Sequence, residues 1–420
     1  MQKIFFSEMI KQKMLLEKQG HSCTLLGIGP MSHNLIEASL RLGKEKDFPV
    51  MFIASRNQID TDELGGGYVC NWNQKQFVQN IKDIAEEVGF EGLYYICRDH
   101  GGPWQRDKEK NDKLHPKEAM KKAKESYLAD LVEGFDLLHI DPTKNPHFDD
   151  VIPLSVVIDY TVELIEYIEE ERRKRDLPSV SYEVGTEETN GGLTSIESYN
   201  QFIKELNARL SEKNLPIPSF IVGQTGTLTR LTENVGNFDA LTAKKLSDNA
   251  RAYGVGVKEH NADYLSDEIL YMHPYLGITA ANVAPEFGVV ETRAYLMLGR
   301  IEQNLFKLGL IKSKSDIIET IKTEAVNCGR WRKWMVTDEA NYSEGSALKD
   351  EDIDLITQIS GHYTLENKNV KQSIQVLYAN LNAIGFDCHQ IVVRSIMESI
   401  NRYVDCFKLT GVTTKIRKAL

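Results

Sequence analysis

The sequence lacks any apolar run long enough to cross a membrane. No stretch of its 420 residues reaches the roughly 18 to 20 apolar positions that a membrane helix needs. The N-terminal segment, MQKIFFSEMIKQKMLLEKQG, carries lysines and glutamates among its apolar positions. That mixture predicts an amphipathic helix within residues 1–22 rather than a signal peptide. We therefore expect no membrane association.

Paired cysteines are missing as well. The six cysteines are scattered along the chain, and no two of them form a CxxC motif. In a chain of this length, scattered cysteines favour free thiols in a reducing compartment over a disulfide or zinc framework. The expected location is the cytoplasm.

The chain also has no excess of basic residues and no glycine loop of the kind that binds nucleotide phosphates. Its net charge of −11 argues against a broad surface for nucleic acid or anionic lipid. A small anionic substrate remains compatible, because a pocket can be locally positive. Without a Walker-type or kinase-type loop, a kinase function has no support.

Eight short apolar runs alternate with segments of helical spacing. The runs are residues 23–29, 50–55, 93–100, 137–141, 179–187, 219–224, 254–260 and 276–282. Each is rich in β-branched or aromatic residues and ends in polar or glycine residues, which is typical of buried strands. Eight strand–helix units predict an α/β fold, a closed (β/α)8 TIM barrel over residues 23–319. An open doubly wound sheet is the rival arrangement.

The C-terminal part of the chain lacks this alternation. A long helix over 289–310 is expected after the eighth run, and residues 369–385 and 389–407 have helical apolar periodicity. No linker rich in proline, glycine or serine separates this part from the rest. We therefore predict a helical C-terminal extension over residues 320–420 that packs on the barrel.

Polar residues end or follow the eight runs. In a parallel barrel the carboxyl ends of the strands share one face, where the βα loops build the active site. This rule selects candidate substrate contacts, namely His33, Arg56, Asn57, Gln58, Gln224, Asp263, Asn282 and Glu286.

Histidines and carboxylates at several strand ends predict a metal site. Such residues converge once the sheet closes, and together they are a usual ligand set for zinc or manganese. The predicted ligands are His100, Glu187 and His260, with zinc as the first choice and manganese or cobalt as alternatives. A metal with an open position can polarise a carbonyl and stabilise an enediolate, which retro-aldol cleavage, isomerisation and epimerisation of sugars share.

Carboxylates beside this site can move protons if burial or a like charge raises their pKa. The predicted catalytic group is Asp99, Asp141 and Glu183. Glu183 and Glu187 share one strand face by their spacing, and we expect that face to point into the barrel. On the outward face they would only be solvated. His139 lies in the fourth run, where a structural role is favoured.

Two residues predict the charge of the substrate. Arg56 follows the second run and can form a bidentate pair with a phosphate or carboxylate, with a surface salt bridge as the alternative. Glu286 is expected to project from the eighth loop and to repel a second anionic group. We therefore expect a sugar with one anionic end.

The strand-end segments resemble those of a known family. They are SHNLIEASL, NQ followed by GGY, DHGGP, HIDPT, YEVGTEE, EHNADY, and NVAPEFG leading to IEQ. They occur in the family's order over nearly the whole barrel, whereas the C-terminal 90 or so residues match only vaguely. The family is the Z-type, so-called non-catalytic, subunit of class II tagatose-bisphosphate aldolase, formerly labelled tagatose-6-phosphate kinase.

The resemblance implies a (β/α)8 barrel and a set of functional residues. These are Asp99, His100, Asp141, Glu187, His260 and Asp263. Asp99–His100 resembles the strand-3 pair of class II aldolases, in which the histidine binds zinc and the aspartate donates a proton. Other members of the Z-type family are metal-dependent epimerases of ketose phosphates or keto-sugar acids.

The chain departs from the family at three positions. Ala284 and Glu286 stand where a glycine and a small residue are usual, and Arg56 stands where a small residue is usual. A glycine lost from a possible phosphate-binding turn, with a carboxylate added beside it, argues against a bisphosphate substrate.

The sequence thus predicts a metal-dependent carbon–carbon lyase or epimerase acting on a ketose, a ketose phosphate or a related acidic sugar. The rival is a non-catalytic subunit that stabilises a separate catalytic aldolase barrel, which would then be its partner. A sugar-binding barrel without turnover is a third hypothesis. We also expect a homo-oligomer.

Overall fold

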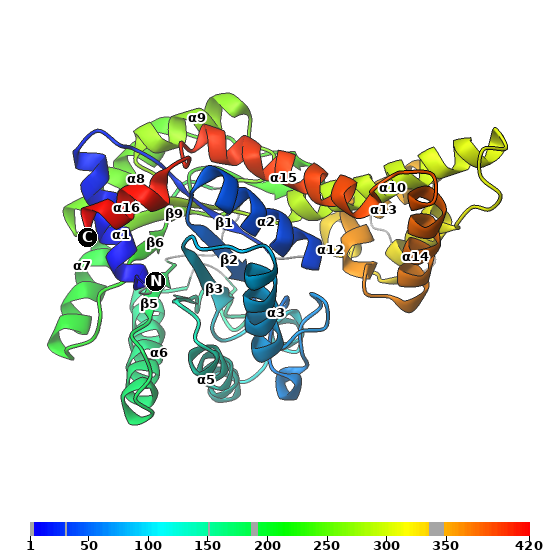
Figure 1. Cartoon of the computed structure of the whole chain (residues 1–420). Helices are drawn as coiled ribbons and strands as arrows, with labels where there is room; N and C mark the ends of the chain where they lie inside the picture. Colours follow the sequence, from blue (N-terminus) through cyan, green and yellow to red (C-terminus); the bar gives the residue numbers. More distant parts are fainter. Residues whose placement is uncertain (1–3, 30–31, 150–151, 186–191, 336–347) are drawn as a thin grey trace.

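Eight parallel strands close into a barrel at the centre of the protein (Figure 1). The computed structural model describes residues 4–29, 32–149, 152–185, 192–335 and 348–420. The strands, in barrel order, are β1 (Leu25–Ile28), β10 (Ala280–Val283), β9 (Gly256–Glu259), β6 (Phe220–Val222), β5 (Ser181–Val184), β4 (Leu137–Ile140), β3 (Tyr94–Gly101) and β2 (Val50–Ala54). Each strand overlaps one of the eight predicted runs. The TIM barrel is therefore confirmed, and the open doubly wound sheet is wrong.

The barrel strands are buried on both faces, because helices cover the outside and side chains fill the inside. All five residues of β2, VMFIA, are buried, which is the continuous apolar pattern of a parallel strand. Glycine allows one close approach between strands. A Cβ at Gly27 in β1 would lie 2.2 Å from Oδ1 of Asn282 in β10, so the glycine leaves room for that amide inside the barrel.

Helices follow the strands and form the outer layer. They are α2 (His33–Lys46), α3 (Gln74–Glu87), α4 (Asp107–Asn111), α5 (Pro116–Glu133), α6 (Leu154–Lys174), α7 (Ile196–Glu212), α8 (Ala240–Ala252), α9 (Asp267–Leu276) and α10 (Pro285–Lys307), with a 3-10 turn η1 (Asp62–Leu64). Side-chain caps fix several starts: Ser32 caps α2, and Asn73 with Gln76 forms a capping box on α3. No helix among the described residues has the length and apolarity to span a bilayer.

Two details of this layer differ from the expectation. The helix after the eighth strand begins at Pro285, four residues before the predicted start, because proline is well suited to the first helical position. A short antiparallel ribbon, β7 (Thr229–Arg230) with β8 (Glu233–Asn234), follows β6. A ribbon this short carries no alternating apolar pattern from which it could have been predicted.

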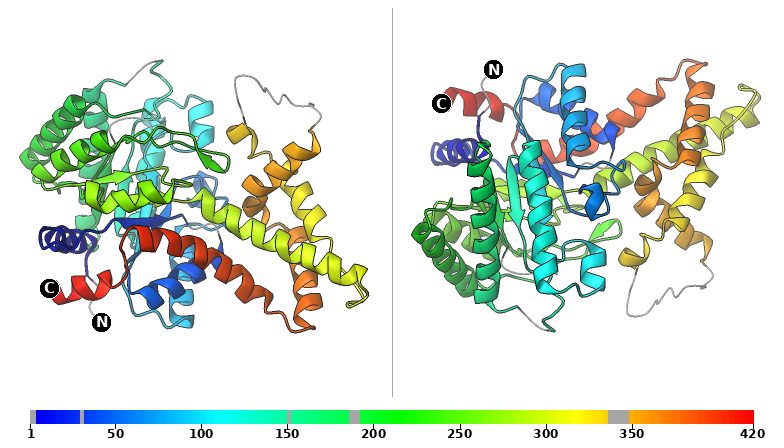
Figure 2. Two further views of the ribbon diagram at one scale, coloured as in Figure 1. Left: turned by 90° about the horizontal axis from the view of Figure 1, so that it is seen from above. Right: turned by 90° about the horizontal axis from the view of Figure 1, so that it is seen from below.

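The C-terminal extension packs along α10. It contains α11 (Ile317–Asn327), α12 (Arg332–Met335), α13 (Asp350–Ser360), η2 (Gly361–Thr364) and α14 (Lys368–Asn382). From there α15 (Cys388–Cys406) runs back beside α10 and along α2, and α16 (Val412–Ala419) ends the chain next to the N-terminal helix (Figure 2). The helical character of this part is as predicted. The domain boundary near residue 320 stays a prediction.

The extension also contacts segments at the carboxyl ends of the barrel strands. Lys333 pairs with Asp107 after β3 at 2.9 Å, and Tyr363 packs edge-on against Tyr68 after β2 at a centroid distance of 4.9 Å. Leu231, in the ribbon after β6, packs against a small second core within the extension. The extension is therefore fastened to loops that follow three different strands.

The N-terminal helix α1 (Phe6–Lys18) covers the opposite end of the barrel. The Phe6 ring packs edge-on against Tyr95, near the start of β3, and against Phe220, at the start of β6, with centroid distances of 5.1 and 5.8 Å. Phe6 is 2% exposed, whereas its neighbour Phe5 is 49% exposed. The predicted helix therefore closes the amino end of the barrel with one aromatic side chain.

Replacing Phe6 by Ala should lower the free energy of unfolding by about 3–5 kcal/mol, because a large buried side chain would leave a cavity. Phe5→Ala is the matched control and should change stability by less than about 0.5 kcal/mol. Urea denaturation followed by circular dichroism measures both. Equal effects of the two substitutions would show that α1 does not close the barrel.

Candidate active site

Three histidines meet at the carboxyl ends of the barrel strands. His100 lies in β3, His139 lies in β4, and His260 directly follows β9. Their ring centroids are 4.7 Å (His100–His260), 5.1 Å (His100–His139) and 5.2 Å (His139–His260) apart. One nitrogen from each ring lies within 4.8 Å of the others. This face of the barrel is where (β/α)8 enzymes carry out their chemistry.

An irregularity in β3 helps to position the first histidine. The pairing of β3 with β4 shifts by one residue between Arg98 and Gly101, and His100 adopts a positive φ of 44°. A bulge of this kind re-aims side chains and is common beside active sites, where non-glycine residues also keep strained backbones. The shift also lets the backbone N–H of His100 donate to Nδ1 of His139 at 3.1 Å.

The imidazoles of His100 and His260 face each other. Nε2 of His100 lies 3.1 Å from Nδ1 of His260. The opposite nitrogens bind carboxylates: Nδ1 of His100 is 2.7 Å from Asp141, and Nε2 of His260 is 2.8 Å from Glu183. In the neutral tautomer that donates to its carboxylate, each ring would leave a lone pair on the nitrogen that faces the other ring.

Two facing lone pairs suit a metal ion. Metal-bound histidines generally direct their other N–H to a carboxylate, as both rings do here. Two zinc–nitrogen bonds at a tetrahedral angle place their nitrogens about 3.3 Å apart, close to the distance observed. The arrangement therefore fits a zinc-like cation at the site predicted from the sequence. Glu187, the third predicted ligand, lies outside the described residues.

His139 belongs to this cluster, although the sequence favoured a structural role for it. Its Nδ1 is 3.6 Å from Glu183 and 3.9 Å from Asp99, and its Nε2 is buried without a hydrogen-bond partner among the described residues. Burial lowers the pKa of His139, but Glu183 and Asp99 outweigh burial and raise it overall. A buried polar atom without a partner is costly, so a ligand is the natural partner for Nε2.

Glu183 lies in the barrel interior between a lysine and a histidine. One of its oxygens is 2.6 Å from Nζ of Lys258, the other binds His260, and both Glu183 and Lys258 are fully buried. Burial raises the pKa of Glu183, but Lys258 and His139 lower it to about 2. Because both oxygens are engaged, the structure gives Glu183 a positioning role in place of the predicted proton transfer. The inward direction expected for its strand face is confirmed.

Lys258 was missed by the sequence reasoning. Lys258 lies in β9 two residues before His260, which directly follows that strand, so the period of two in extended chain places both side chains on one face. A lysine within an apolar run ordinarily indicates the exposed end of a strand. If Glu183 points into the barrel, its buried carboxylate needs a cation beside it, and this requirement could have identified Lys258.

Asp141 likewise has a positioning role in place of the predicted catalytic one. Its Oδ2 binds His100, and its Oδ1 accepts the backbone N–H of Thr143 at 3.0 Å and the Thr143 hydroxyl. Burial raises the pKa of Asp141, but His100 outweighs it and holds the pKa far below the ordinary range. The carboxylate thus stays ionised and fixes the tautomer of His100.

Asp99 is the carboxylate with room to act. Its Oδ1 accepts a hydrogen bond from Nδ2 of Asn282 at 3.1 Å and lies 3.8 Å from Nε2 of His260. Burial raises the pKa of Asp99, but His100 and His260 outweigh burial and hold it well below its usual value. Asp99 is therefore ionised at neutral pH and can accept a proton, although its pKa is lowered and not raised as the sequence reasoning required for a proton-transfer group. Oδ1 of Asn282 is buried without a partner among the described residues, so it can accept from a ligand hydroxyl.

Residues 10–214 match a known family. Its description is D-tagatose-1,6-bisphosphate aldolase subunit GatZ/KbaZ-like. The resemblance drawn from the strand-end segments is thereby confirmed over this part, which runs from α1 through α7 and includes Asp99, His100, His139, Asp141 and Glu183. No match to a curated protein was found.

Solved structures with the same fold include kinase-labelled, epimerase and aldolase proteins. A probable tagatose 6 phosphate kinase from Sinorhizobium meliloti 1021 aligns with a TM-score of 0.73 and 19% identity, over 91% of this chain and 100% of that one. The fructuronate-tagaturonate epimerase UxaE from Cohnella laeviribosi aligns with a TM-score of 0.59 and 12% identity, over 93% and 82%. Fructose-bisphosphate aldolase from Campylobacter jejuni aligns with a TM-score of 0.52 and 10% identity, over 97% and 96%. At these identities the alignments establish the fold alone.

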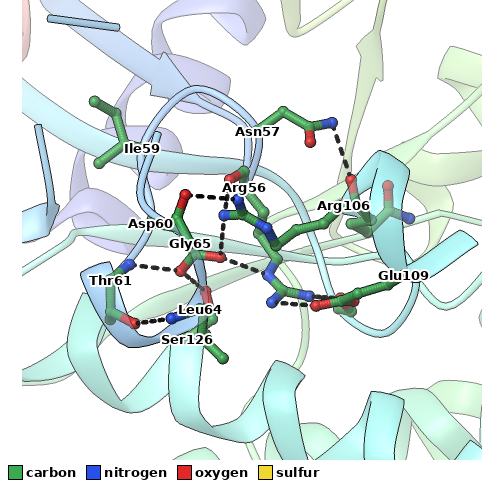
Figure 3. A network of polar contacts seen from close by, with 12 residues as sticks. Arg56, Asn57, Ile59, Asp60, Thr61, Leu64, Gly65, Arg106, Glu109 and Ser126 are labelled. Atoms are coloured by element: carbon green, nitrogen blue, oxygen red, sulfur yellow. Dashed lines mark hydrogen bonds and ion pairs between the residues drawn. The ribbon is translucent and has the colours of Figure 1, made fainter. Parts of the chain in front are cut away.

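Arg56 lies in a network of polar contacts with Asp60 and Glu109 (Figure 3). Its guanidinium is fully buried, pairs with both oxygens of Glu109 at 2.9 Å, binds Asp60 at 3.1 Å and donates to the carbonyl of Gly102 at 2.8 Å. The predicted substrate contact is therefore wrong, because every nitrogen of the guanidinium is already engaged. Arg56 instead ties the loops after β2 and β3 together.

The side chains of Glu286 and Asp263 also form hydrogen bonds within the protein. Oδ1 of Asp263 accepts the backbone N–H groups of Ala284 and Glu286 at 3.0 and 2.9 Å, which caps α10. Glu286 is buried and accepts from the backbone of Tyr264 at 2.6 Å and from the hydroxyl of Tyr403 in α15. It does not project into the mouth of the barrel, so the predicted repulsion of a second anion is wrong.

The other predicted substrate contacts lie in different environments. Asn57 donates to the carbonyl of Gln105 at 3.2 Å, and Gln58 accepts a backbone N–H of its own loop at 2.8 Å, so both support the loop after β2. Gln224 is buried after β6, and His33 is exposed at the start of α2. Asn282, described above, is joined to the histidine cluster through its bond to Asp99.

Arg56→Met should lower the free energy of unfolding by about 3–5 kcal/mol, because the buried carboxylate of Glu109 loses its bidentate partner and Asp60 keeps only its pair with Arg106. Arg175→Met removes a pair between Arg175, 42% exposed, and Glu171 on the surface, and should cost no more than about 1 kcal/mol. Denaturant unfolding of the two variants makes the comparison. A stable Arg56→Met protein would contradict a structural role for this arginine.

Proposed function

We propose that the protein is a metal-dependent carbon–carbon lyase or epimerase acting on a ketose, a ketose phosphate or a related acidic sugar. The observation that carries the proposal is the pair of facing nitrogens of His100 and His260, each ring held by a carboxylate on its far side. Beside this pair lies Asp99, an ionised carboxylate that is only partly enclosed. A cation site next to a free base is what proton abstraction beside a carbonyl requires.

Each side chain then has one task. Asp141 and Glu183 orient the two imidazoles, and Lys258 keeps Glu183 ionised. Asp99 accepts the proton from the substrate, either from the carbon next to the carbonyl or from the hydroxyl that becomes a new carbonyl in retro-aldol cleavage. A bound divalent cation would supply Lewis acidity toward the substrate carbonyl. Oδ1 of Asn282 would accept from a substrate hydroxyl.

The comparisons support this class of reaction. The family description names an aldolase subunit, and the solved structures with the same fold include an aldolase and an epimerase. Aldol cleavage and epimerisation next to a carbonyl share the need to stabilise an enediolate and to move one proton. Both reactions could therefore use the same base and cation site.

The family description favours a second candidate, a subunit that supports a separate aldolase barrel. Such a subunit needs no base at its barrel mouth, whereas Asp99 here is held ionised among three histidines. Assays of the protein alone and mixed with a class II aldolase barrel separate the two candidates. Activity that appears only in the mixture would support the subunit.

If His100 and His260 bind the metal, replacing either one should weaken metal binding. His100→Ala and His260→Ala should each weaken zinc binding at this site at least roughly tenfold, because each removes one direct ligand. His389→Ala, which alters a half-exposed histidine paired with Glu37, is the control and should leave zinc binding unchanged. Competition with a chromophoric chelator measures the affinities. Unaltered binding in both test variants would remove the metal from the proposal.

Asp99→Asn should remove proton transfer and leave the rest of the site intact. The amide keeps the shape of the carboxylate but cannot accept the proton, so exchange of substrate hydrogen with deuterated water should fall by roughly 10² to 10⁴-fold. A series of ketose phosphates and keto-sugar acids provides the substrates, and Asp159→Asn in the exposed face of α6 provides the control. Normal exchange in Asp99→Asn would assign the base elsewhere.

A further inference from the structure

Three side chains of metal-binding type meet at a second place. His33 is the first residue of α2, Cys70 lies between β2 and α3, and Glu366 lies between η2 and α14. One ligand atom of each lies within 4.8 Å of the other two. His33 and Cys70 belong to the segments that follow the first two barrel strands, whereas Glu366 belongs to the C-terminal extension. The cluster therefore bridges the barrel and the extension.

We propose that His33, Cys70 and Glu366 bind a second divalent metal, zinc by preference, which fastens the extension to the barrel. Imidazole, thiolate and carboxylate are the three side-chain ligands that zinc uses in proteins. A thiolate ligand favours zinc over magnesium or calcium, which prefer oxygen. Three protein ligands leave a fourth position for water. Because His33 is exposed, a metal ion can enter from solvent.

Neighbouring residues hold the three ligands in place. The His33 ring packs edge-on against Trp72 with a centroid distance of 4.6 Å, and Lys371 pairs with one oxygen of Glu366. Cys70 has a φ of 51° and the next residue, Asn71, has a φ of 54°. Left-handed backbone at a non-glycine residue costs roughly 1–3 kcal/mol, and it persists where other interactions enforce it. A metal bound to Cys70 would be one such interaction.

The charge around Cys70 also suits a cation. The carboxylates of Glu366 and Glu291 lie near the Cys70 thiol. A divalent ion would offset these carboxylates and replace the thiol proton. The same seam already contains an aromatic contact, because Tyr68 packs against Tyr363 and Arg330 stacks on Tyr68 at 3.9 Å. The metal would add a cross-link within a few residues of this contact.

Cobalt binding to the full-length protein tests the site. Cobalt bound by a cysteine gives a thiolate-to-metal charge-transfer band in the near ultraviolet, and the histidine cluster at the barrel mouth contains no cysteine. The wild type should bind two cobalt ions per chain and show the band. Cys70→Ser should lose the band and one ion, whereas Cys328→Ser, which alters an exposed cysteine, should keep both.

The two metal sites can fail separately. His100→Ala should weaken cobalt binding at the barrel mouth and keep the thiolate band. Failure of the proposed reaction would therefore not contradict the second metal site. If Cys70→Ser does not fold, His33→Ala at an exposed position should weaken the band-forming site at least roughly tenfold. Hydrogen exchange over residues 361–368 should rise in Cys70→Ser and stay unchanged in Cys328→Ser. Absence of the band in the wild type, or its survival in Cys70→Ser, would overturn the proposal.

Discussion

The ion pair between Lys258 and Glu183 inside the barrel is the interaction on which the candidate site depends. A carboxylate enclosed by barrel strands would take up a proton unless a cation faced it, because burial disfavours the charged form. Lys258 supplies that cation at 2.6 Å. Glu183 therefore stays ionised and accepts the proton on Nε2 of His260, and so the lone pair on Nδ1 of His260 faces His100. A neutral Glu183 could either donate to Nε2 or accept from it, so it would not favour that tautomer.

Much of the fold could be predicted from the sequence because its signals are local. The apolar runs locate the strands, and their number with the helical segments between them predicts closure into a barrel. Asp99, His100, His260 and Asn282 were found by the same reasoning, because they lie at strand ends and parallel strands bring such ends together. No partner distant in the sequence is needed to place them at the mouth.

The errors arose where distant partners decide the role of a side chain. Arg56 was expected at the pocket, but Glu109 lies 53 positions further along and takes its guanidinium. Glu286 was expected in the mouth, but Tyr403 lies 117 positions away and binds its carboxylate from α15. Neither partner is visible in the pattern around a strand end. The helical extension was predicted as such, but its return along α2 depends on tertiary packing that periodicity alone does not specify.

Charge balance provides a further argument for a cation at the histidine cluster. Asp99, Asp141 and Glu183 are all held ionised, and Lys258 is the one ammonium among them in the described part of the site. The remaining two negative charges could be balanced by protonating two of the three histidines, of which His139 has a raised pKa, or by one divalent ion. Burial lowers the pKa of His260 even though Asp99 and Glu183 raise it, and a charged His100 at 3.1 Å lowers it further, which disfavours two adjacent imidazolium rings. A divalent cation balances the same charge while leaving both rings neutral, and neutral rings are what their lone pairs require to act as ligands.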